Sequence, residues 1–345
     1  MNIIDLRSDT VTLPTPQMLE AMRTAELGDD VFCEDPTVNK LEEIAARRMG
    51  KEAALFVPSG TMANLVSVLV HCSRGQEVIL GDLSHIFLNE AGGISSVGGI
   101  HPHTIPNLPD GTMRPQDIKN AIRGDNVHFP RTSLICLENT HNRCSGSPLT
   151  PEYMAVVGEL ARESGLSVHL DGARIFNAAI ALGVDVRDLT KNVESVSFCL
   201  SKGLCAPVGS LVCGTKEFIS ESRRNRKLLG GGMRQVGVIA AAGIVALDSM
   251  ADRLKEDHEN AQRLVDGLND VSFIEVDESV DIRTNILYVD LVGGTIGPNK
   301  FLQRLVNKGL KVHQTGRSRF RMVTHHGISS KNIDDVIEII TTTLS

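Results

Sequence analysis

Residues 53–72 read AALFVPSGTMANLVSVLVHC, and this stretch decides the fold class that we expect. Its first part, 53–57, is a short apolar run of the kind that forms a buried strand. A turn at 58–61 follows, and from Met62 to Val70 the apolar residues recur at the i, i+3, i+4, i+7, i+8 spacing of a helix. A buried strand that leads through a glycine-containing turn into a helix is the repeating unit of α/β folds.

The same alternation continues along the chain and predicts an α/β fold with a largely parallel sheet flanked by helices. Apolar runs bounded by turn residues predict further strands at 77–80, 134–137, 167–170, 196–200 and 210–213, with helices between several of them, such as 151–163. Past about residue 250 the pattern predicts a small α+β unit, with helices at 253–268, 300–308 and 332–342 and strands at 273–276, 286–291, 311–314 and 319–323. We therefore predict an N-terminal arm at 1–12, a large domain at 13–250 and a small C-terminal domain at 251–345.

The composition argues against several classes of protein. The 345 residues include 35 Lys+Arg and 42 Asp+Glu, and the resulting net charge of −7 opposes nucleic-acid binding. The longest uncharged apolar stretch, 236–247, has 12 residues, whereas a membrane-spanning helix needs about 20. No long apolar run follows a basic start at the N-terminus, so we expect no secretory signal. Seven cysteines without a C-x-x-C pair predict neither a disulfide framework nor a zinc site, and favour a reducing cytoplasm.

Polar residues follow three of the apolar runs, at the carboxyl ends of strands where ligands of α/β proteins bind. Lys202 closes the run 196–200, and a desolvated lysine there is a nucleophile for carbonyl groups, although a surface lysine would look the same. Asp171 ends the run 167–170 about one βαβ unit before Lys202, and could hold a protonated ring nitrogen or simply cap the next helix. The turn Ser59-Gly60-Thr61 offers backbone N–H groups and two hydroxyls to an anion, or is an ordinary capping turn.

These three features together are more specific than any one of them. A phosphate cradle, an acid for a pyridinium nitrogen and a lysine that forms a Schiff base are what pyridoxal phosphate requires. His85 follows the strand predicted at 77–80 and could stack on the ring of this cofactor, although a loop histidine is the plainer interpretation. The chain contains no Walker-type phosphate-binding sequence. The residues themselves thus predict a pyridoxal-phosphate enzyme.

Motifs along the whole chain resemble those of the threonine aldolases, which are pyridoxal-phosphate enzymes of the aspartate-aminotransferase-like fold (fold type I). They are DLRSDTVT at 5–12, GDDV at 28–31, EDPT at 34–37, FVPSGTM at 56–62, ENTHN at 138–142, HLDGAR at 169–174, LSKGL at 200–204, GGGMRQ at 230–235 and RMVTH at 321–325. The resemblance implies a carbon–carbon lyase of amino acid metabolism. It would reversibly cleave L-threonine, L-allo-threonine or both, and other β-hydroxy-α-amino acids, to glycine and an aldehyde, which is acetaldehyde for threonine.

The resemblance also implies which residues hold the cofactor. Lys202 would carry pyridoxal phosphate as a Schiff base. Asp171 would pair with the ring nitrogen, and His85 would stack on the ring. Gly60 and Thr61 would hold the phosphate. All five positions agree with the interpretation reached from the residues alone.

Further residues would bind the substrate or complete the site of a second subunit. Ser8, Arg174 and Arg321 match positions that grip the substrate carboxylate, and arginine suits this task because its guanidinium binds carboxylates through two hydrogen bonds. Arg174 would also lie beside the cofactor. Lys227 and Arg234 would reach the cofactor of a neighbouring subunit. The resemblance therefore implies a homo-oligomer with shared sites, typically a tetramer.

Two positions near the substrate stay open. The base that removes the β-hydroxyl proton should be a histidine, because the pKa of histidine lies near neutrality. The candidates are His128, at a family position near the substrate hydroxyl, and His85. Asn89 stands where many family members carry Tyr, His or Phe, so the sequence does not fix the preference between threonine and allo-threonine. We assign no metal ligand.

Three other interpretations compete with the aldolase. A lyase on the same scaffold could eliminate a β-substituent and release pyruvate and ammonia. A catalytically silent protein could bind pyridoxal phosphate, but it would not need the carboxylate-binding Arg174 and Arg321. Residues 223–234 hold five cations and no acid, which alone would suggest a solvated face or a weak nucleic-acid patch. The expected partners are thus an amino-acid substrate and further copies of the chain, with neither nucleic acid nor membrane.

Overall fold

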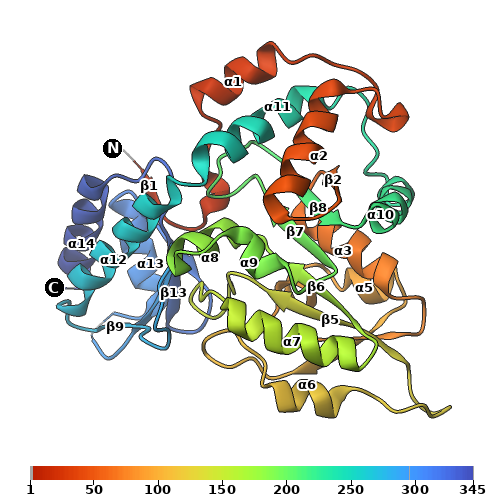
Figure 1. The fold of residues 1–345 in the computed structure, drawn as a ribbon. Helices are drawn as coiled ribbons and strands as arrows, with labels where there is room; N and C mark the ends of the chain where they lie inside the picture. Colours follow the sequence, from red (N-terminus) through yellow and green to blue (C-terminus); the bar gives the residue numbers. More distant parts are fainter. Residues whose placement is uncertain (1–2, 295, 345) are drawn as a thin grey trace.

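A seven-stranded sheet runs through the larger part of the molecule, in the order β2-β8-β7-β6-β5-β3-β4 (Figure 1). The computed structural model describes residues 3–294 and 296–344. Strands β7, β6, β5, β3 and β4 are parallel, whereas β8 runs antiparallel to β7 and β2. The strands span Ala53–Val57 (β2), Glu77–Gly81 (β3), His101–Ile105 (β4), Thr132–Glu138 (β5), Ser167–Asp171 (β6), Ser195–Cys199 (β7) and Ser210–Gly214 (β8). The predicted α/β class with a largely parallel sheet is confirmed.

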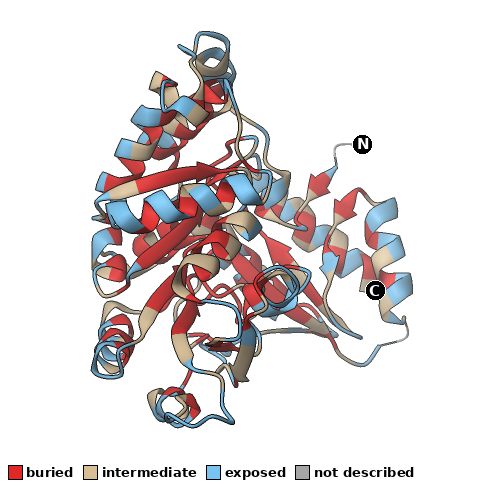
Figure 2. Ribbon diagram, turned by 90° about the vertical axis from the view of Figure 1, so that its right-hand side faces the viewer, coloured by how far each residue is buried: buried red, intermediate tan, exposed pale blue. Residues whose placement is uncertain are grey.

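Successive side chains of each strand pack under different helices, because they point to opposite faces of the sheet. Phe56, Ile135 and Leu170 belong to the core beneath α2, α7, α8 and α9, whereas Leu55 and Leu134 lie on the face covered by α3 and α10. Figure 2 shows the strands buried between helices whose outer surfaces are exposed. These helices span Pro36–Met49 (α2), Gly60–His71 (α3), Pro151–Glu163 (α7), Ile175–Leu182 (α8), Val186–Thr190 (α9) and Lys216–Leu228 (α10).

Several helices begin where the sequence offers a capping side chain followed by proline. The side chains of Thr15, Asp35 and Thr150 accept hydrogen bonds from the first turns of α1 (Pro16–Arg23), α2 and α7, each of which has proline at its start. Short helices also occur at Asp9–Val11, Asp30–Phe32, His85–Leu88 (α4), Gly93–Ser96 (α5) and Pro115–Ala121 (α6). The apolar stretch predicted to be too short for a membrane forms α11 (Gly237–Val245) and a π-helical turn, Ala246–Met250. No helix within the described residues could cross a membrane.

The remaining residues form a smaller unit with its own core (Figure 1). Its antiparallel sheet has the order β12-β13-β10-β9 and packs with three helices. The elements are α12 (Leu254–Asn269), β9 (Ile274–Val276), β10 (Ile286–Leu291), α13 (Pro298–Asn307), β11 (Leu310–Lys311), β12 (His313–Gln314), β13 (Arg319–Val323) and α14 (Ser330–Leu344). Strand β1 (Ile4–Asp5) pairs with β11, and Ile4 and Leu6 join this core. The segment predicted as an arm thus packs on the small unit.

Besides β1, which lies in the segment predicted as an arm, two strands differ from the sequence-based prediction. The strand expected at 311–314 is divided, because β11 pairs with β1 whereas β12 pairs with β13. Strand β4 was not predicted, since its sequence HPHTI is polar and its first four residues are not buried. It lies at the edge of the large sheet, where a proline and polar side chains are tolerated.

Candidate active site

The carboxyl ends of the parallel strands bring the predicted residues to one edge of the large sheet. Glu138 ends β5 and lies in register with Asp171, the last residue of β6. Asp171 is in turn the register partner of Ser197 on β7. Lys202 follows β7 in the next loop, and His85 begins α4 after β3. This is the edge at which α/β proteins bind ligands.

Asp171 presents a buried carboxylate at this edge. Its Oδ2 accepts a hydrogen bond of 2.8 Å from Nδ2 of Asn64, on α3, and its Oδ1 accepts one of 3.1 Å from the backbone N–H of Ala173. The side chain is 3% exposed. A carboxylate held in this way is suited to pairing with a cationic group of a ligand.

His85 is held by two glutamates. Its backbone N–H donates to Oε2 of Glu138 at 2.6 Å, and its ring Nδ1 lies 2.8 Å from Oε1 of Glu90. Burial disfavours the imidazolium, but the hydrogen bond to Glu90 and the charges of Asp171 and the two glutamates outweigh it, so the pKa of His85 is raised. Burial, reinforced by the charge of Asp171, raises the pKa of Glu90. Ligand atoms of His85, Glu90 and Asp171 lie within 4.8 Å of one another, which is also a geometry that a metal ion could use.

Lys202 and the first turn of α3 both lie near the carboxyl end of β7. The carbonyl oxygen of Lys202 accepts a 2.9 Å hydrogen bond from the hydroxyl of Thr12, and its side chain is half-buried. Ser59 caps α3 by accepting from the N–H of Met62 at 3.2 Å. A Cβ atom on Gly60 would lie 2.9 Å from Sγ of Cys199, so glycine lets the N-terminus of α3 approach the end of β7.

Arg174 lies buried against the N-terminal segment. Its Nε and Nη2 donate to the two carboxylate oxygens of Asp9, both at 2.7 Å, and Nη1 has no hydrogen-bond partner among the described residues. Burial opposes the charge of Asp9, but Arg174 and Lys202 outweigh it and lower the pKa of Asp9. Ser8 donates to Oδ1 of Asp9 at 3.4 Å. Arg174, Ser8 and Lys202 are therefore connected electrostatically through Asp9.

Arg321 reaches the same region from β13 of the small unit. Its Nη1 donates to Oδ1 of Asn142 at 2.8 Å and its Nη2 to the carbonyl oxygen of Arg7 at 3.0 Å. A pocket of about 290 Å³ is lined by Arg321, by His85 and Asn89 of the large unit, and by Asn142. Burial and the neighbouring charge of Arg174 lower the pKa of the Arg321 guanidinium. The pocket thus combines a cation for a carboxylate with a histidine.

Among the predicted residues that the structure describes, His85, Asn89 and Arg321 are the ones that line this pocket. His128 is exposed in the segment between α6 and β5, which projects from the molecule (Figure 1). Lys227 is exposed on α10, and Arg234 pairs with Asp29 at 3.0 Å and lies over the ring of Phe32. None of His128, Lys227 and Arg234 forms a hydrogen bond or ion pair with a pocket residue within the described chain. The roles of Lys227 and Arg234 stay predictions that concern a second subunit, and the role of His128 near the substrate hydroxyl also stays a prediction.

Sequence reasoning missed several residues that hold the site together. Glu138 ends an apolar strand just as Asp171 does, and this signal could have identified it. Asn64 is a polar residue within the apolar helix α3, and this position was the available clue. Glu90 and Asp9 carry no such signal, because Asn64 and Arg174, which bond to them in the fold, lie 26 and 165 positions away in the sequence.

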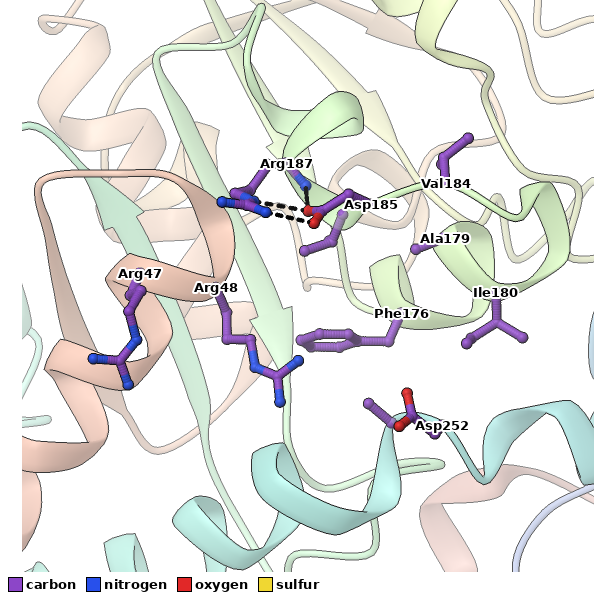
Figure 3. Close-up of a pocket in the computed structure, with 11 residues that line it drawn as sticks. Arg47, Arg48, Phe176, Ala179, Ile180, Val184, Asp185, Arg187 and Asp252 are labelled. Atoms are coloured by element: carbon purple, nitrogen blue, oxygen red, sulfur yellow. Dashed lines mark hydrogen bonds and ion pairs between the residues drawn. The ribbon is translucent and has the colours of Figure 1, made fainter.

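A different pocket, of about 360 Å³, lies along α8 (Figure 3). Arg47 and Arg48 of α2 lie on one side of it, the ring of Phe176 forms part of its wall, and Arg187 is engaged by Asp185. It contains none of the residues that the sequence predicted for the site. We therefore place the candidate active site at the edge of the sheet.

Known proteins are similar to this chain both in sequence and in fold. Residues 5–291 match the model of the beta-eliminating lyase family. The low-specificity L-threonine aldolase 1 of Arabidopsis thaliana is 50% identical over 96% of this chain and 94% of its own. The low specificity L-threonine aldolase of Escherichia coli K12 is 48% identical over 83% and 84%. Among solved structures, the threonine aldolase of Leishmania major superposes with a TM-score of 0.84 at 20% identity, covering 99% of both chains.

Proposed function

This chain belongs to the beta-eliminating lyase family and, within it, to the low-specificity L-threonine aldolases, and from that premise we propose how its site works. The enzyme cleaves L-threonine and L-allo-threonine to glycine and acetaldehyde, and it uses pyridoxal phosphate. The observation that supports this reaction most directly is the pocket that joins His85 of one unit to Arg321 of the other. It provides a proton acceptor and a carboxylate anchor for one small amino acid.

The residues present fit pyridoxal phosphate. A buried carboxylate, Asp171, is suited to a protonated ring nitrogen, and a half-buried amine, Lys202, follows the adjacent strand. The N-terminus of α3 offers unpaired backbone N–H groups and the hydroxyl of Thr61 to a phosphate. Because Gly60 permits a close approach, this helix end lies beside β7, the strand that precedes Lys202 in the sequence. When bound, the cofactor supplies an electron sink for the pair released from the Cα–Cβ bond.

The arginines orient the amino acid. Arg321, together with the Nη1 of Arg174 that Asp9 leaves available, would bind the substrate carboxylate. Two fixed attachment points restrict rotation about Cα, so that the Cα–Cβ bond is the one aligned for cleavage. Ser8, which is bonded to Asp9, supports the same carboxylate.

Two histidines of the described chain line this pocket, His85 and His313, and His85, which is held by Glu90, is the proton acceptor in our proposal. If its Nδ1–H donates to Glu90, the other ring nitrogen, Nε2, is free to accept the β-hydroxyl proton. His128 stays the alternative, and it would have to be contributed by a neighbouring subunit, because it is exposed on a projecting segment. Asn89 lines the pocket beside His85 and is placed to contact the substrate side chain.

We further propose a homo-oligomer, typically a tetramer in this family, whose subunits share sites. Lys227 and Arg234 lie on a surface that also exposes Phe32 and Leu228, at 68% and 77%. Large apolar side chains clustered with cations are typical of an interface. A neighbour that covers this surface would receive the two cations.

The function is tested by supplying L-threonine and L-allo-threonine separately to the enzyme with pyridoxal phosphate. We expect acetaldehyde and glycine in equal amounts from both. Lys202→Ala should lose activity, since the amine that binds the cofactor is removed, and full activity in that variant would refute the mechanism. Release of pyruvate and ammonia from L-serine, with no acetaldehyde from either threonine, would instead identify a β-eliminating lyase.

A further inference from the structure

A chain of buried hydrogen bonds leads from Asp171 into the core of the large unit. Asn64 lies 2.8 Å from Asp171, and its Oδ1 lies 3.2 Å from Nε2 of His169. Nδ1 of His169 lies 2.8 Å from the hydroxyl of Ser195, which lies 2.7 Å from Nε2 of His71. Of these five residues, the proposed mechanism uses only Asp171.

These hydrogen bonds connect three elements within the core of the large unit. Asn64 and His71 come from α3, His169 from β6 and Ser195 from β7. Asn64, His169 and Ser195 are at most 2% exposed. Burial lowers the pKa of His169 to about 3 and that of His71 to about 4, so both rings are neutral at neutral pH. Polar groups so deeply buried are costly unless every one of them is bonded.

Asn64 uses its full hydrogen-bonding capacity. Its two N–H groups donate to Oδ2 of Asp171 and Oε1 of Glu90, both at 2.8 Å. Its carbonyl oxygen accepts from Ser197 at 2.9 Å and from His169. A carboxamide has two donors and two lone pairs, so no capacity is left. The orientation of Asn64 is therefore fixed from both sides.

The donors in the chain all point toward the carboxylates. Because Asp171 and Glu90 accept, Asn64 must turn its NH₂ group toward them and its oxygen toward His169. His169 then donates from Nε2 and accepts at Nδ1 from the hydroxyl of Ser195, whose oxygen accepts from His71. Successive hydrogen bonds with the same direction polarise one another and strengthen the last donor.

We propose that Asn64, His169, Ser195 and His71 form a directional relay that holds Asp171 and Glu90 in place and stabilises their negative charge. Asn64 is its central positioning residue. The proposal rests on the proposed function, because the charge on Asp171 would in turn keep the ring nitrogen of pyridoxal phosphate protonated. Breaking the relay should therefore make the ring nitrogen lose its proton more easily, even when Asp171 itself is unchanged.

The test compares three variants of the full-length enzyme. Asn64→Asp keeps the size of the side chain but removes both donated hydrogen bonds. Ser195→Ala breaks the relay two links from Asn64, and Ser67→Ala is its matched control. Ser67 is likewise 0% exposed, lies on α3, and donates only to the carbonyl oxygen of Ala63. The readouts are the dissociation constant of pyridoxal phosphate and the ¹⁵N chemical shift of its labelled ring nitrogen, which reports protonation independently of turnover.

We expect Asn64→Asp to raise the dissociation constant about tenfold or more, which is a loss equal to one strong hydrogen bond. Ser195→Ala should move the ring-nitrogen signal toward the unprotonated position, whereas Ser67→Ala should leave it unchanged. If Asn64→Asp does not fold, the serine pair alone decides. Equal signals in the two serine variants would overturn the relay while the aldolase assignment stands. Failure of the unmodified enzyme to bind pyridoxal phosphate would overturn the proposed function and the relay together.

Discussion

The ion pair between Asp9 and Arg174 is buried on both sides, with side chains 0% and 5% exposed. Replacing Asp9 by asparagine leaves the guanidinium without a counter-charge in the interior. We expect Asp9→Asn to lower the free energy of unfolding by about 3–5 kcal/mol, as for other broken buried pairs. Urea denaturation followed by circular dichroism measures this loss.

The exposed pair Asp5–Arg7 provides the matched control. Its side chains are 19% and 47% exposed, so Asp5→Asn should cost less than about 1 kcal/mol. The pKa of Asp9 is lowered in the folded protein, so the Asp9–Arg174 pair stabilises the folded state at pH values above the ordinary pKa of aspartate. This stabilisation is lost as the pH falls toward the lowered pKa. A similar loss of unfolding free energy in Asp9→Asn and Asp5→Asn would contradict the claim that burial makes the Asp9–Arg174 pair stabilising.

Glu90 is predicted to set the pH at which His85 becomes a base. The hydrogen bond from His85 to Glu90 favours the imidazolium and raises its pKa, so the neutral ring that accepts a proton forms only at higher pH. Glu90→Gln should lower the pKa of His85 and move the acidic limb of kcat/KM to lower pH. A pH profile of aldehyde release measures the shift.

Glu43→Gln is a suitable control for this experiment, because Glu43 is an exposed surface residue, with a side chain 75% accessible. It should leave the profile unchanged. If the acidic limb stayed in place in Glu90→Gln as well, His85 would not be the titrating base, and His128 of a neighbouring subunit would become the stronger candidate.

At the scale of single residues, the sequence predicts those site residues whose position follows from one strand. Lys202 and Asp171 each follow an apolar run, and the end of a strand in a parallel sheet is a place for ligands. Asn64 and Glu90 were not predicted, because their roles depend on contacts made only in the fold: Asn64 lies 107 positions from Asp171 and 26 positions from Glu90. His128 matches a family motif, but a single chain leaves it exposed.

At the scale of elements, the approach of α3 to β7 should control cofactor binding. A Cβ atom on Gly60 would lie 2.9 Å from Sγ of the buried Cys199, so in Gly60→Ala either this side chain or the first turn of α3 must shift, and we expect the turn to move. We expect the dissociation constant of pyridoxal phosphate to rise about tenfold, since the phosphate contacts depend on that turn. Gly297→Ala, where the added carbon meets open space, should change nothing. Unchanged affinity in Gly60→Ala would show that the phosphate does not bind there.

Which elements could be predicted depends on where they lie in a sheet. Strands β5 and β7 are covered on both faces, so they read as continuous apolar runs and were predicted nearly to their ends. Strand β4 lies at an edge and its polar sequence gives no such signal. The division between β11 and β12 depends on β1, which comes from the opposite end of the chain.

At the scale of the whole molecule, the N-terminal segment joins the two units at the pocket. Ile4 packs in the small core, the carbonyl oxygen of Arg7 accepts from Arg321, and Asp9 pairs with Arg174 of the large unit. The two carboxylate-binding arginines are therefore positioned by one short stretch of chain. The placement of that stretch could not be predicted from local pattern, because it depends on contacts with residues about 165 and 314 positions away.

Sharing of sites between subunits predicts that two inactive variants restore each other. Lys202→Ala lacks the cofactor lysine, and Arg234→Ala lacks the cation offered to the neighbour. A hybrid of the two has one site with an intact Lys202 that receives an intact Arg234. Random mixing of two-fold pairs should therefore recover about a quarter of the unmodified activity, since half of the pairs are hybrids and each has one complete site.

The experiment co-expresses the two variants with different affinity tags and measures aldehyde release from L-threonine before and after the hybrids are isolated. The mixture should show about a quarter of the unmodified activity and the isolated hybrids about half, because one of the two sites in each hybrid is complete. Arg224→Ala is the control for Arg234→Ala. Arg224 is another exposed arginine, but it pairs with Glu221 of its own helix, so its loss should leave activity intact. Because either parent alone lacks one part of every site, recovery in the hybrid can come only from a site built by two chains. Inactive hybrids would mean that each chain completes its own site, and that the surface carrying Lys227 and Arg234 serves assembly alone.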